Sequence, residues 1–236
     1  MPKNHSIISF EGLDCSFKET NFKSFVNSLY KIRDESGFMI HTESFPRYGY
    51  WAAKPAECWL NGYYDRNILK HYPMAINSLY NLDRMDYWLK KNDNGITNLD
   101  LLNAKDKFHY FVFDRYILSN TIYNPIHPGE VHVEDIIFNT DEFSIPRPNI
   151  VVWMRMKNFD VLAKLVATKQ NRDKNELDID FLRKVWERSE MIINSDIFNK
   201  TNIKLIVVDC LYANDTIRPK DELAKYIWNS GIATPN

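Results

Sequence analysis

Five short apolar runs recur along the chain, and longer stretches with helical spacing separate them. The runs lie at 6–10, 38–42, 110–113, 150–154 and 204–208. They are nearly continuous rather than alternating, which is typical of strands that are buried on both faces of a parallel sheet. The pattern therefore predicts five strands that are joined by helices.

The intervening stretches place apolar residues three or four positions apart, as an amphipathic helix does. In the first of them, Phe22, Phe25, Val26, Leu29 and Ile32 share one face. We expect helices at 18–34, 53–70, 74–91, 115–124, 158–170, 178–195 and 219–228, and one at 133–138 within the loop-rich segment 124–148. No repeat or domain boundary interrupts the alternation, so the sequence predicts one α/β domain over 1–236, with helices on both faces of the sheet.

Charge and cysteine content narrow the possible functions. The 30 Lys and Arg residues balance 31 Asp and Glu residues, so no bulk positive field draws the chain to nucleic acid or to an anionic membrane, and we expect neither as a partner. Cys15, Cys58 and Cys210 are widely spaced and form neither a CxxC metal pair nor a disulfide framework. There is no apolar run of membrane-spanning length and no signal-peptide core, so we expect a reduced, cytoplasmic protein.

The turn after the first predicted strand is the first candidate for chemistry. Gly12 and Lys18 fit two of the four fixed positions in the phosphate-binding pattern G-x-x-x-x-G-K-[ST]. Phe17 replaces the second glycine, and Glu19 replaces the hydroxyl residue. Free N–H groups at the start of the following helix would favour a phosphate, whereas the alternative is an ordinary turn with a surface lysine.

The two replacements change the expected chemistry of this turn. Phe17 either adopts the backbone of the missing glycine and points outward, or it crowds the β-phosphate of a nucleotide. Glu19 removes the hydroxyl that usually meets Mg²⁺, but its carboxylate is itself a ligand for that ion. If the turn binds ATP, the contacts are expected from Gly12, Leu13, Asp14, Cys15, Ser16, Phe17, Lys18, Glu19 and Thr20.

Five blocks of sequence lie at 10–14 with Lys18, at 45–49, at 82–84, at 114–123 and at 145–149. In this order they resemble the thymidylate kinases, a family of P-loop nucleoside monophosphate kinases, over nearly the whole chain from Ile7 to about Ile227. The most specific are Phe-Pro-Arg-Tyr-Gly at 45–49 and the block that begins with Asp-Arg-Tyr at 114–116. The resemblance implies a P-loop NTPase-type three-layer sandwich, phosphoryl transfer from MgATP to dTMP giving dTDP and ADP, and a homodimer.

Arginines follow the second and third predicted strands, where a guanidinium suits the oxygens of a phosphate. The resemblance implies that Arg115 holds the 5′-phosphate of the acceptor and bridges toward the transferred phosphoryl group. It also implies that Arg47 and Tyr48 serve the acceptor side. A surface salt bridge is the alternative for either arginine.

Tyr80 and Arg84 lie four residues apart in a predicted helix and therefore share a face. The resemblance implies that Tyr80 stacks on thymine and that Arg84 bonds a carbonyl of the base, with a place in the core as the alternative for Tyr80. By the same resemblance Asn120 meets the base edge, Tyr123 excludes a ribose 2′-hydroxyl, and Asp14 reaches the 3′-hydroxyl.

The resemblance also implies a metal site and a lid. Asp114 is placed for Mg²⁺ or its waters together with Glu19, unless it pairs with a neighbouring basic group. The segment 165–177 resembles the lid, where a cation closes over the phosphates. Arg172 is the first candidate for that cation and Lys169 the second, although either also fits a solvated helix end.

Glu176 matches a glutamate at the end of the lid, without an assigned role. The loop at 209–213 is expected near adenine on topology alone.

Two rival functions stay open. Phe17 and Glu19 favour a nucleotide-binding protein with little kinase activity. Tyr80 and Trp51 leave room for another pyrimidine acceptor such as dUMP or a 5-modified nucleotide.

Overall fold

The computed structural model describes residues 4–65, 72–123, 140–170 and 178–232. At its centre, five parallel strands form one sheet in the order β2-β3-β1-β4-β5. The strands are β1 (His5–Gly12), β2 (Met39–Ser44), β3 (His109–Asp114), β4 (Ile150–Arg155) and β5 (Lys204–Asp209). Each contains most of one apolar run from the sequence analysis, and the predicted fold class is confirmed.

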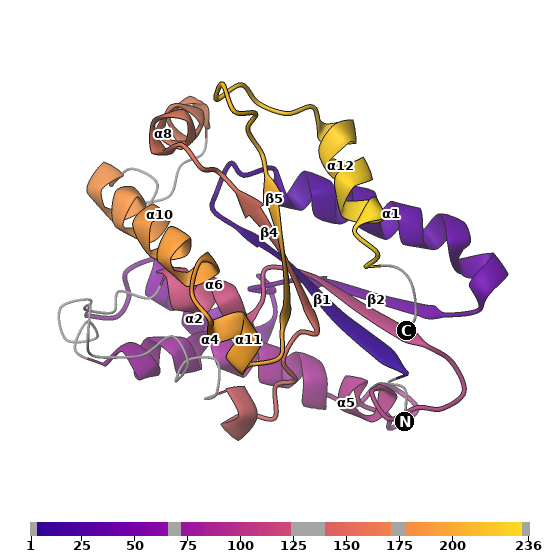
Figure 1. Ribbon diagram of the computed structural model, residues 1–236. Helices are drawn as coiled ribbons and strands as arrows, with labels where there is room; N and C mark the ends of the chain where they lie inside the picture. Colours follow the sequence, from indigo (N-terminus) through magenta and orange to yellow (C-terminus); the bar gives the residue numbers. More distant parts are fainter. Residues whose placement is uncertain (1–3, 66–71, 124–139, 171–177, 233–236) are drawn as a thin grey trace.

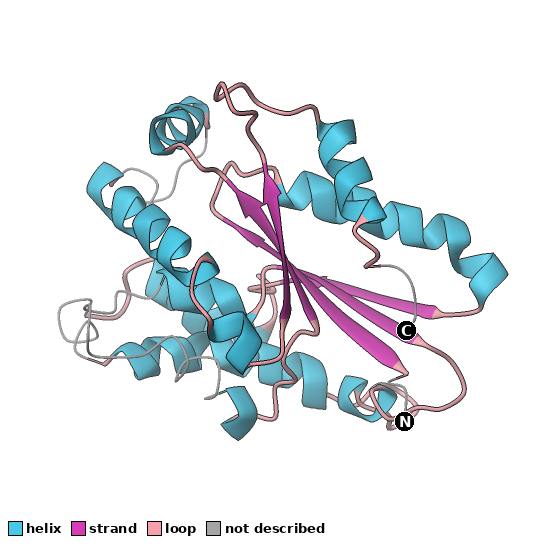
Figure 2. Cartoon of the chain, in the orientation of Figure 1, coloured by secondary structure: helices cyan, strands magenta, loops and turns pink. Residues whose placement is uncertain are grey.

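Helices cover both faces of this sheet (Figures 1 and 2). In Figure 1, α1 and α12 lie together on one side, and α4, α6, α10 and α11 lie on the other. The helices are α1 (Lys18–Ser36), the 3-10 helix η1 (Trp51–Ala53), α2 (Lys54–Leu60), α4 (Pro73–Leu89), α5 (Asn98–Leu101), α6 (Ile117–Tyr123), α8 (Phe159–Thr168), α10 (Ile179–Ile193), α11 (Ile197–Lys200) and α12 (Lys220–Asn229).

Aromatic side chains fill the core on both faces of the sheet. Phe10 of β1 packs on Phe22 and Phe25 of α1, with ring centroids 5.9 and 5.5 Å apart. On the other face, Trp88 of α4 packs on Phe111 of β3 at 4.9 Å. Because successive strand residues point to opposite faces, Phe10 faces α1 while the next residue of β1 faces α6.

Helix boundaries differ from the sequence prediction at several places. The helix expected at 53–70 is wrong in length, because α2 ends at Leu60 and Gly62 follows in a left-handed turn with φ 77°. Residues 66–70 of that expected helix, and the helix expected at 133–138, lie outside the described residues. The short helices α5 and α11 were not expected; a capping box between Thr97 and Asp100 starts α5.

The strand register brings several chain turns to one edge of the sheet. Phe10 of β1 and Ser44 of β2 both lie opposite Asp114, the last residue of β3. Gly12 lies opposite Met154 of β4. Ligands of open α/β sheets bind at the carboxyl ends of the strands, so this edge is where a site is expected.

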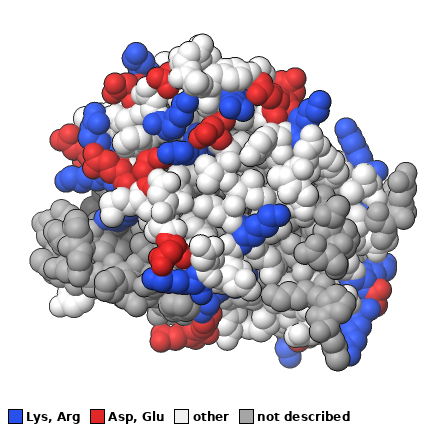
Figure 3. Space-filling view, viewed as in Figure 1, with Lys and Arg blue, Asp and Glu red and all other residues white. Residues whose placement is uncertain are grey.

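The surface carries no single-sign field on the face shown in Figure 3, where basic and acidic side chains are interspersed. This agrees with the net charge of −1. Among the described residues, no helix has the length and apolar character that crossing a membrane requires.

Candidate functional site

The turn between β1 and α1, residues 12–18, is called the phosphate loop below after the sequence pattern that it partly matches. It begins at a glycine that the fold requires. Gly12 has φ 152°, and a Cβ placed there would lie 2.6 Å from Ser16 Oγ and 2.8 Å from the backbone oxygen of Met154. The second of these atoms belongs to the neighbouring strand and cannot move aside. The loop closes with a hydrogen bond from the Ser16 N–H to the oxygen of Leu13 at 3.2 Å.

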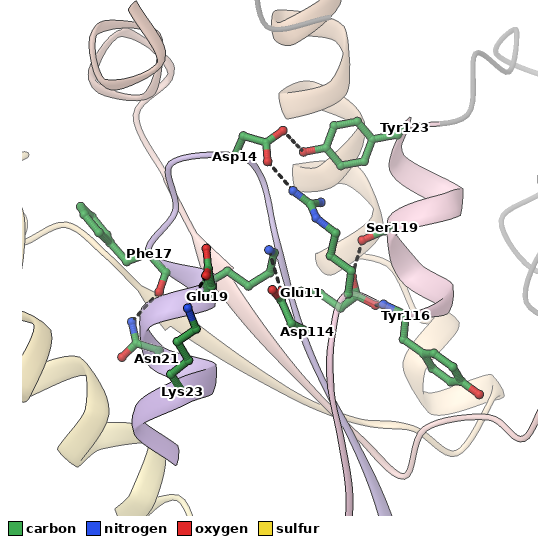
Figure 4. A network of polar contacts seen from close by, with 12 residues as sticks. Glu11, Asp14, Phe17, Glu19, Asn21, Lys23, Asp114, Tyr116, Ser119 and Tyr123 are labelled. Atoms are coloured by element: carbon green, nitrogen blue, oxygen red, sulfur yellow. Dashed lines mark hydrogen bonds and ion pairs between the residues drawn. The ribbon is translucent and has the colours of Figure 1, made fainter. Parts of the chain in front are cut away.

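Two further residues of the loop have left-handed backbone without being glycine. Cys15 has φ 61° and Phe17 has φ 60°. The sequence pattern places the second glycine at Phe17, and its backbone is the one that glycine would adopt. The Phe17 ring packs against the core and points away from Asp14 and Asp114 (Figure 4). Of the two orientations that the sequence left open, the structure has the outward one.

Lys18, the first residue of α1, forms a buried ion pair with Asp114. Its Nζ lies 2.8 Å from Asp114 Oδ1, and both side chains are nearly closed to solvent. Burial lowers the pKa of Lys18, and repulsion from Arg115 lowers it further, while Asp114 opposes both effects. The alternative noted for Asp114, a pairing with a basic neighbour, therefore occurs, and that neighbour is the lysine of the phosphate loop.

Arg115, directly after β3, pairs with Asp14 of the phosphate loop. The hydroxyl of Tyr123 donates to the other oxygen of Asp14 at 3.3 Å, and the guanidinium of Arg115 lies 5.3 Å from the Tyr123 ring centroid. Burial opposes ionisation of Asp14, but Arg115 and Lys18 outweigh it and hold the pKa of this carboxyl below its usual range. Lys18, which follows β1, is thus paired with a carboxylate at the end of β3. Arg115, which follows β3, is paired with a carboxylate that follows β1.

Glu19 and Thr20 are exposed residues in the first turn of α1. Glu19 pairs with Lys23 one helical turn later, at 2.5 Å, and this hydrogen bond lowers its pKa. Within the described ranges, no group of three or more His, Cys, Asp or Glu side chains is arranged to hold a metal ion. Of the two expected metal ligands, Asp114 is paired with Lys18, and Glu19 is paired with Lys23.

Arg47 lies at the carboxyl end of β2, just after the cis peptide bond between Phe45 and Pro46. Its Nε contacts Asp83 at 2.8 Å and its Nη2 contacts Asp86 at 2.6 Å. Both carboxylates belong to α4, so the guanidinium ties this segment to the helix. The salt-bridge alternative therefore applies to Arg47, although the pair is buried, and Tyr48 is 58% exposed.

A buried polar cluster joins α4 to α6. Nη2 of Arg84 donates to the oxygen of Tyr116 at 2.6 Å and to Asn120 Oδ1 at 3.1 Å. The amide of Asn120 donates to Asn77 Oδ1 at 2.7 Å. Of the residues expected to meet the base, Arg84 and Asn120 are thus in contact, and Tyr80 is half-buried on the same helix.

The guanidinium of Arg84 keeps two unused donors. Its Nε and Nη1 are buried, and no acceptor faces them in the part of the chain that the structure describes. Burial lowers the pKa of Arg84. Because an unpaired buried donor is costly, this arrangement is expected where a ligand supplies the missing acceptors.

Sequence reasoning missed three buried polar residues near the site. Asn77 and Asn81 lie on the face of α4 that carries Arg84, and Glu11 lies at the end of β1. A signal was present for each, because they are polar residues at core-facing positions of elements that are otherwise apolar. Such positions more often hold apolar side chains.

The loop after β5 contacts the phosphate loop from the other side. The thiol of Cys210 donates to the oxygen of Ser16 at 3.3 Å, and burial raises the pKa of this thiol to about 12. Leu211 and Ile217 form an isolated antiparallel bridge, so the 209–213 segment expected near adenine opens a short hairpin.

Part of the expected lid is described. Lys169 follows α8, and its positive charge contributes to the lowered pKa of Asp14, so it lies near the phosphate loop. Arg172 and Glu176 lie outside the described residues.

Comparisons with known proteins bear on the fold. No family model matches the sequence, and no curated protein matches it. Among solved structures, the chain is similar to thymidylate kinase from Candida albicans, with a TM-score of 0.59 and 16% identity over 98% of this chain and 92% of that one. It is also similar to thymidylate kinase from Ehrlichia chaffeensis, with a TM-score of 0.60 and 16% identity over 95% and 97%. The chain therefore has the fold of thymidylate kinases, as the sequence blocks implied.

Proposed function

We propose that this protein transfers a phosphoryl group from MgATP to the 5′-phosphate of dTMP, giving dTDP and ADP. One observation carries the proposal: the ion pairs Lys18–Asp114 and Arg115–Asp14 cross between the ends of β1 and β3. A lysine at a helix start and an arginine from the neighbouring strand end thus meet in one small region. Two cations brought together in this way suit a donor and an acceptor phosphate.

The donor side is the loop 12–17 with the start of α1. Backbone N–H groups at this helix start and the ammonium of Lys18 bind the β- and γ-phosphates of ATP. The outward orientation of Phe17 supports this assignment, because the ring does not occupy the side of the loop where Asp14 and Asp114 lie. The remaining loop residues, from Gly12 to Thr20, complete the ATP site.

The acceptor side is formed by α4 and α6. Arg115 binds the 5′-phosphate of dTMP. Asp14 then accepts a hydrogen bond from the 3′-hydroxyl, and Tyr123 excludes a 2′-hydroxyl. The two unused donors of Arg84 bind an oxygen acceptor on the base, beside Asn120. Tyr80 stacks on the base, and Arg47 and Tyr48 order the segment that borders the acceptor phosphate.

The residues present suit Mg²⁺ only in part. Asp114 offers a buried carboxylate beside Lys18, which suits a hard cation or its bound water. Glu19 would have to leave Lys23 to serve as a ligand. When bound with ATP, Mg²⁺ would neutralise charge on the phosphates.

Catalysis in this proposal consists of alignment and charge neutralisation. The acceptor already carries a phosphate dianion, so it needs little help from a general base. Lys18, Arg115 and a lid cation, Arg172 or Lys169, stabilise the oxygens of the transferred group.

A homodimer is part of the proposal. Light scattering of the purified protein would measure its mass in solution and so test for a dimer.

A coupled assay of ADP release with ATP and dTMP tests the proposal. We expect turnover by the wild type, and a loss of about 100-fold or more in kcat for Lys18→Ala and in kcat/KM for dTMP with Arg115→Ala. Lys31→Ala, at an exposed lysine further along the same helix, is the matched control and should keep wild-type turnover. Unchanged turnover in Lys18→Ala, or unchanged dTMP use in Arg115→Ala, would refute the assignment.

A second candidate is a nucleotide-binding protein with little kinase activity. Phe17 and Glu19 replace the usual glycine and hydroxyl residue of the loop. In the structure, Phe17 has a strained backbone and Glu19 is paired with Lys23, and both observations favour this candidate. Binding of both nucleotides without ADP release above background would support this candidate over the kinase.

The acceptor base is a separate question within the kinase proposal. Donors on Arg84 recognise a carbonyl oxygen, which thymine and uracil both present, so they do not separate dTMP from dUMP or a 5-modified nucleotide. The similar Candida albicans enzyme is described as having broad substrate specificity. Turnover across a panel of deoxynucleoside monophosphates would identify the preferred acceptor.

A further inference from the structure

Glu11 is a fully buried carboxylate that the proposed reaction does not use. It is the second-last residue of β1 and has no exposed surface. Burial raises its pKa, and the hydrogen bond from Ser119 and the charges of Arg115, Arg84 and Lys18 oppose that rise. A carboxylate in such a place needs hydrogen-bond donors, and their identity indicates what it holds.

Both donors belong to the chain that follows Arg115. The backbone N–H of Tyr116 donates to Glu11 Oε1 at 2.9 Å, and the hydroxyl of Ser119 donates to Oε2 at 2.6 Å. Figure 4 shows the carboxylate between strand β1 and the start of α6. Glu11 therefore ties the sheet to the turn that carries the arginine.

That turn is strained and needs support. Arg115 has φ 62°, a left-handed conformation that costs a side-chain-bearing residue about 1–2 kcal/mol. Its own N–H donates to the oxygen of Phe10 at 2.9 Å, and the next N–H along the chain is the one bound by Glu11. Two consecutive residues of β1 thus hold the two peptide groups on either side of the strained residue.

We propose that Glu11 is a positioning residue for Arg115: by accepting the Tyr116 N–H, it fixes the left-handed turn that directs the guanidinium toward Asp14 and the phosphate loop. The property that matters is the reach of an oxygen atom to that N–H, and not the negative charge. The catalytic consequence rests on the proposed function, whereas the structural consequence does not.

Two conservative substitutions separate reach from charge. Glu11→Gln keeps an oxygen at the same distance and removes the charge, and Glu11→Asp keeps the charge and withdraws the oxygens by one methylene. We expect Glu11→Gln to keep kcat and the KM for dTMP within about fivefold of wild type. We expect Glu11→Asp to lower kcat/KM for dTMP by about tenfold or more, with the KM for ATP within about twofold.

Ser119→Ala is the matched control, because it breaks the other hydrogen bond to Glu11 and leaves the bond to Tyr116 in place. We expect it to change kcat/KM for dTMP by less than about threefold. The reverse ranking of the two Glu11 variants, or wild-type kinetics in Glu11→Asp, would overturn the proposal. Equal losses in both variants for dTMP and ATP together would also overturn it, because they would indicate a general structural role.

Crystal structures of the two variants give a readout that does not depend on turnover. In Glu11→Asp the Arg115 turn should leave the left-handed region or its guanidinium should leave Asp14, and in Glu11→Gln both should stay in place. An unchanged Arg115 in Glu11→Asp would refute the inference. If the wild type transfers no phosphoryl group, the proposed function fails while this comparison still decides the role of Glu11.

Discussion

Phe17 combines an unfavourable backbone with a favourable position of its ring. Its left-handed φ of 60° costs about 1 kcal/mol relative to glycine, but the half-buried ring packs against the core. The sequence alone left open whether Phe17 crowds the β-phosphate of a nucleotide. At the residue scale the backbone of the loop is nevertheless the one that glycine would adopt, and the cost falls on stability rather than on the space for a phosphate.

We expect Phe17→Gly to have opposing effects on stability that nearly cancel. Relief of backbone strain and loss of ring packing are each worth about 1 kcal/mol, so the free energy of unfolding in urea should change by less than about 1 kcal/mol. Because the ring points away from Asp14 and Asp114, kcat/KM for ATP should stay within about threefold of wild type. A tenfold rise in this constant would mean instead that the ring obstructs the nucleotide.

Arg84 differs from Phe17, because a bound ligand can restore the stability that this residue costs. Two of its donors are buried without an acceptor in the described part of the chain. Each unpaired buried donor costs about 1–3 kcal/mol, and Arg84→Met removes that cost, which offsets the lost bonds to Tyr116 and Asn120. We therefore expect Arg84→Met to melt at the same temperature as wild type or a few degrees higher, measured by calorimetry without ligand.

The same variant should lose the rise in melting temperature that saturating dTMP produces in wild type, because stabilisation by a ligand follows its affinity. Arg33→Met, at the far end of α1, serves as the control and should keep that rise. A full dTMP-dependent rise in Arg84→Met would contradict the placement of Arg84 at the base.

At the scale of elements, two glycines differ in what surrounds them: Gly12 ends β1, and Gly37 follows α1. Gly37 has φ 68° with no atom within 4 Å of the position that a Cβ would take, so alanine there meets only backbone strain. Gly12 adds a contact of 2.8 Å with the backbone of β4. We expect Gly37→Ala to lower the free energy of unfolding by about 1 kcal/mol and Gly12→Ala by about 3 kcal/mol or more, in urea titrations. Equal losses would show that the loop yields at Gly12.

The strands were predictable because a parallel sheet buries both faces of each strand, which leaves continuous apolar runs such as 110–113. The length of α2 was not, because apolar residues continue beyond Leu60 while Gly62 turns the chain. In the site, Lys18 and Arg115 were identified from motifs. Asn77 and Glu11 were missed, because their core-facing positions mark them as unusual but do not reveal the partners distant in the sequence to which they bond.

At the scale of the whole molecule, buried ionisable groups determine how stability varies with pH. His41 of β2 and His109 of β3 lie on adjacent strands, with Nε2 of the first 2.9 Å from Nδ1 of the second. Burial and the neighbouring His109 lower the pKa of His41 to about 4. Burial also lowers the pKa of His109. The charge of Asp106 opposes this shift, and the charges of His5 and Lys107 add to it.

These two histidines make the fold sensitive to mild acid. A histidine whose pKa is lowered by folding stabilises the native state above its unfolded pKa, near 6.5, and that stability is lost as the pH falls toward the folded pKa. The window for His41 therefore runs from about pH 6.5 down to about pH 4. Glu11 acts in the opposite direction, because its raised pKa favours the native state as the pH falls.

We expect the free energy of unfolding to fall between pH 7 and pH 5, with about 1 kcal/mol of the loss due to His41, since part of its ring is open to screening solvent. His41→Gln keeps an N–H that can donate to His109 and removes the titration, so its unfolding free energy should fall less over the same interval. Urea titrations of both proteins at the two pH values measure the difference. Because Glu11 and His109 are unchanged in the variant, an equal fall in both proteins would show that the acid sensitivity arises elsewhere than at His41.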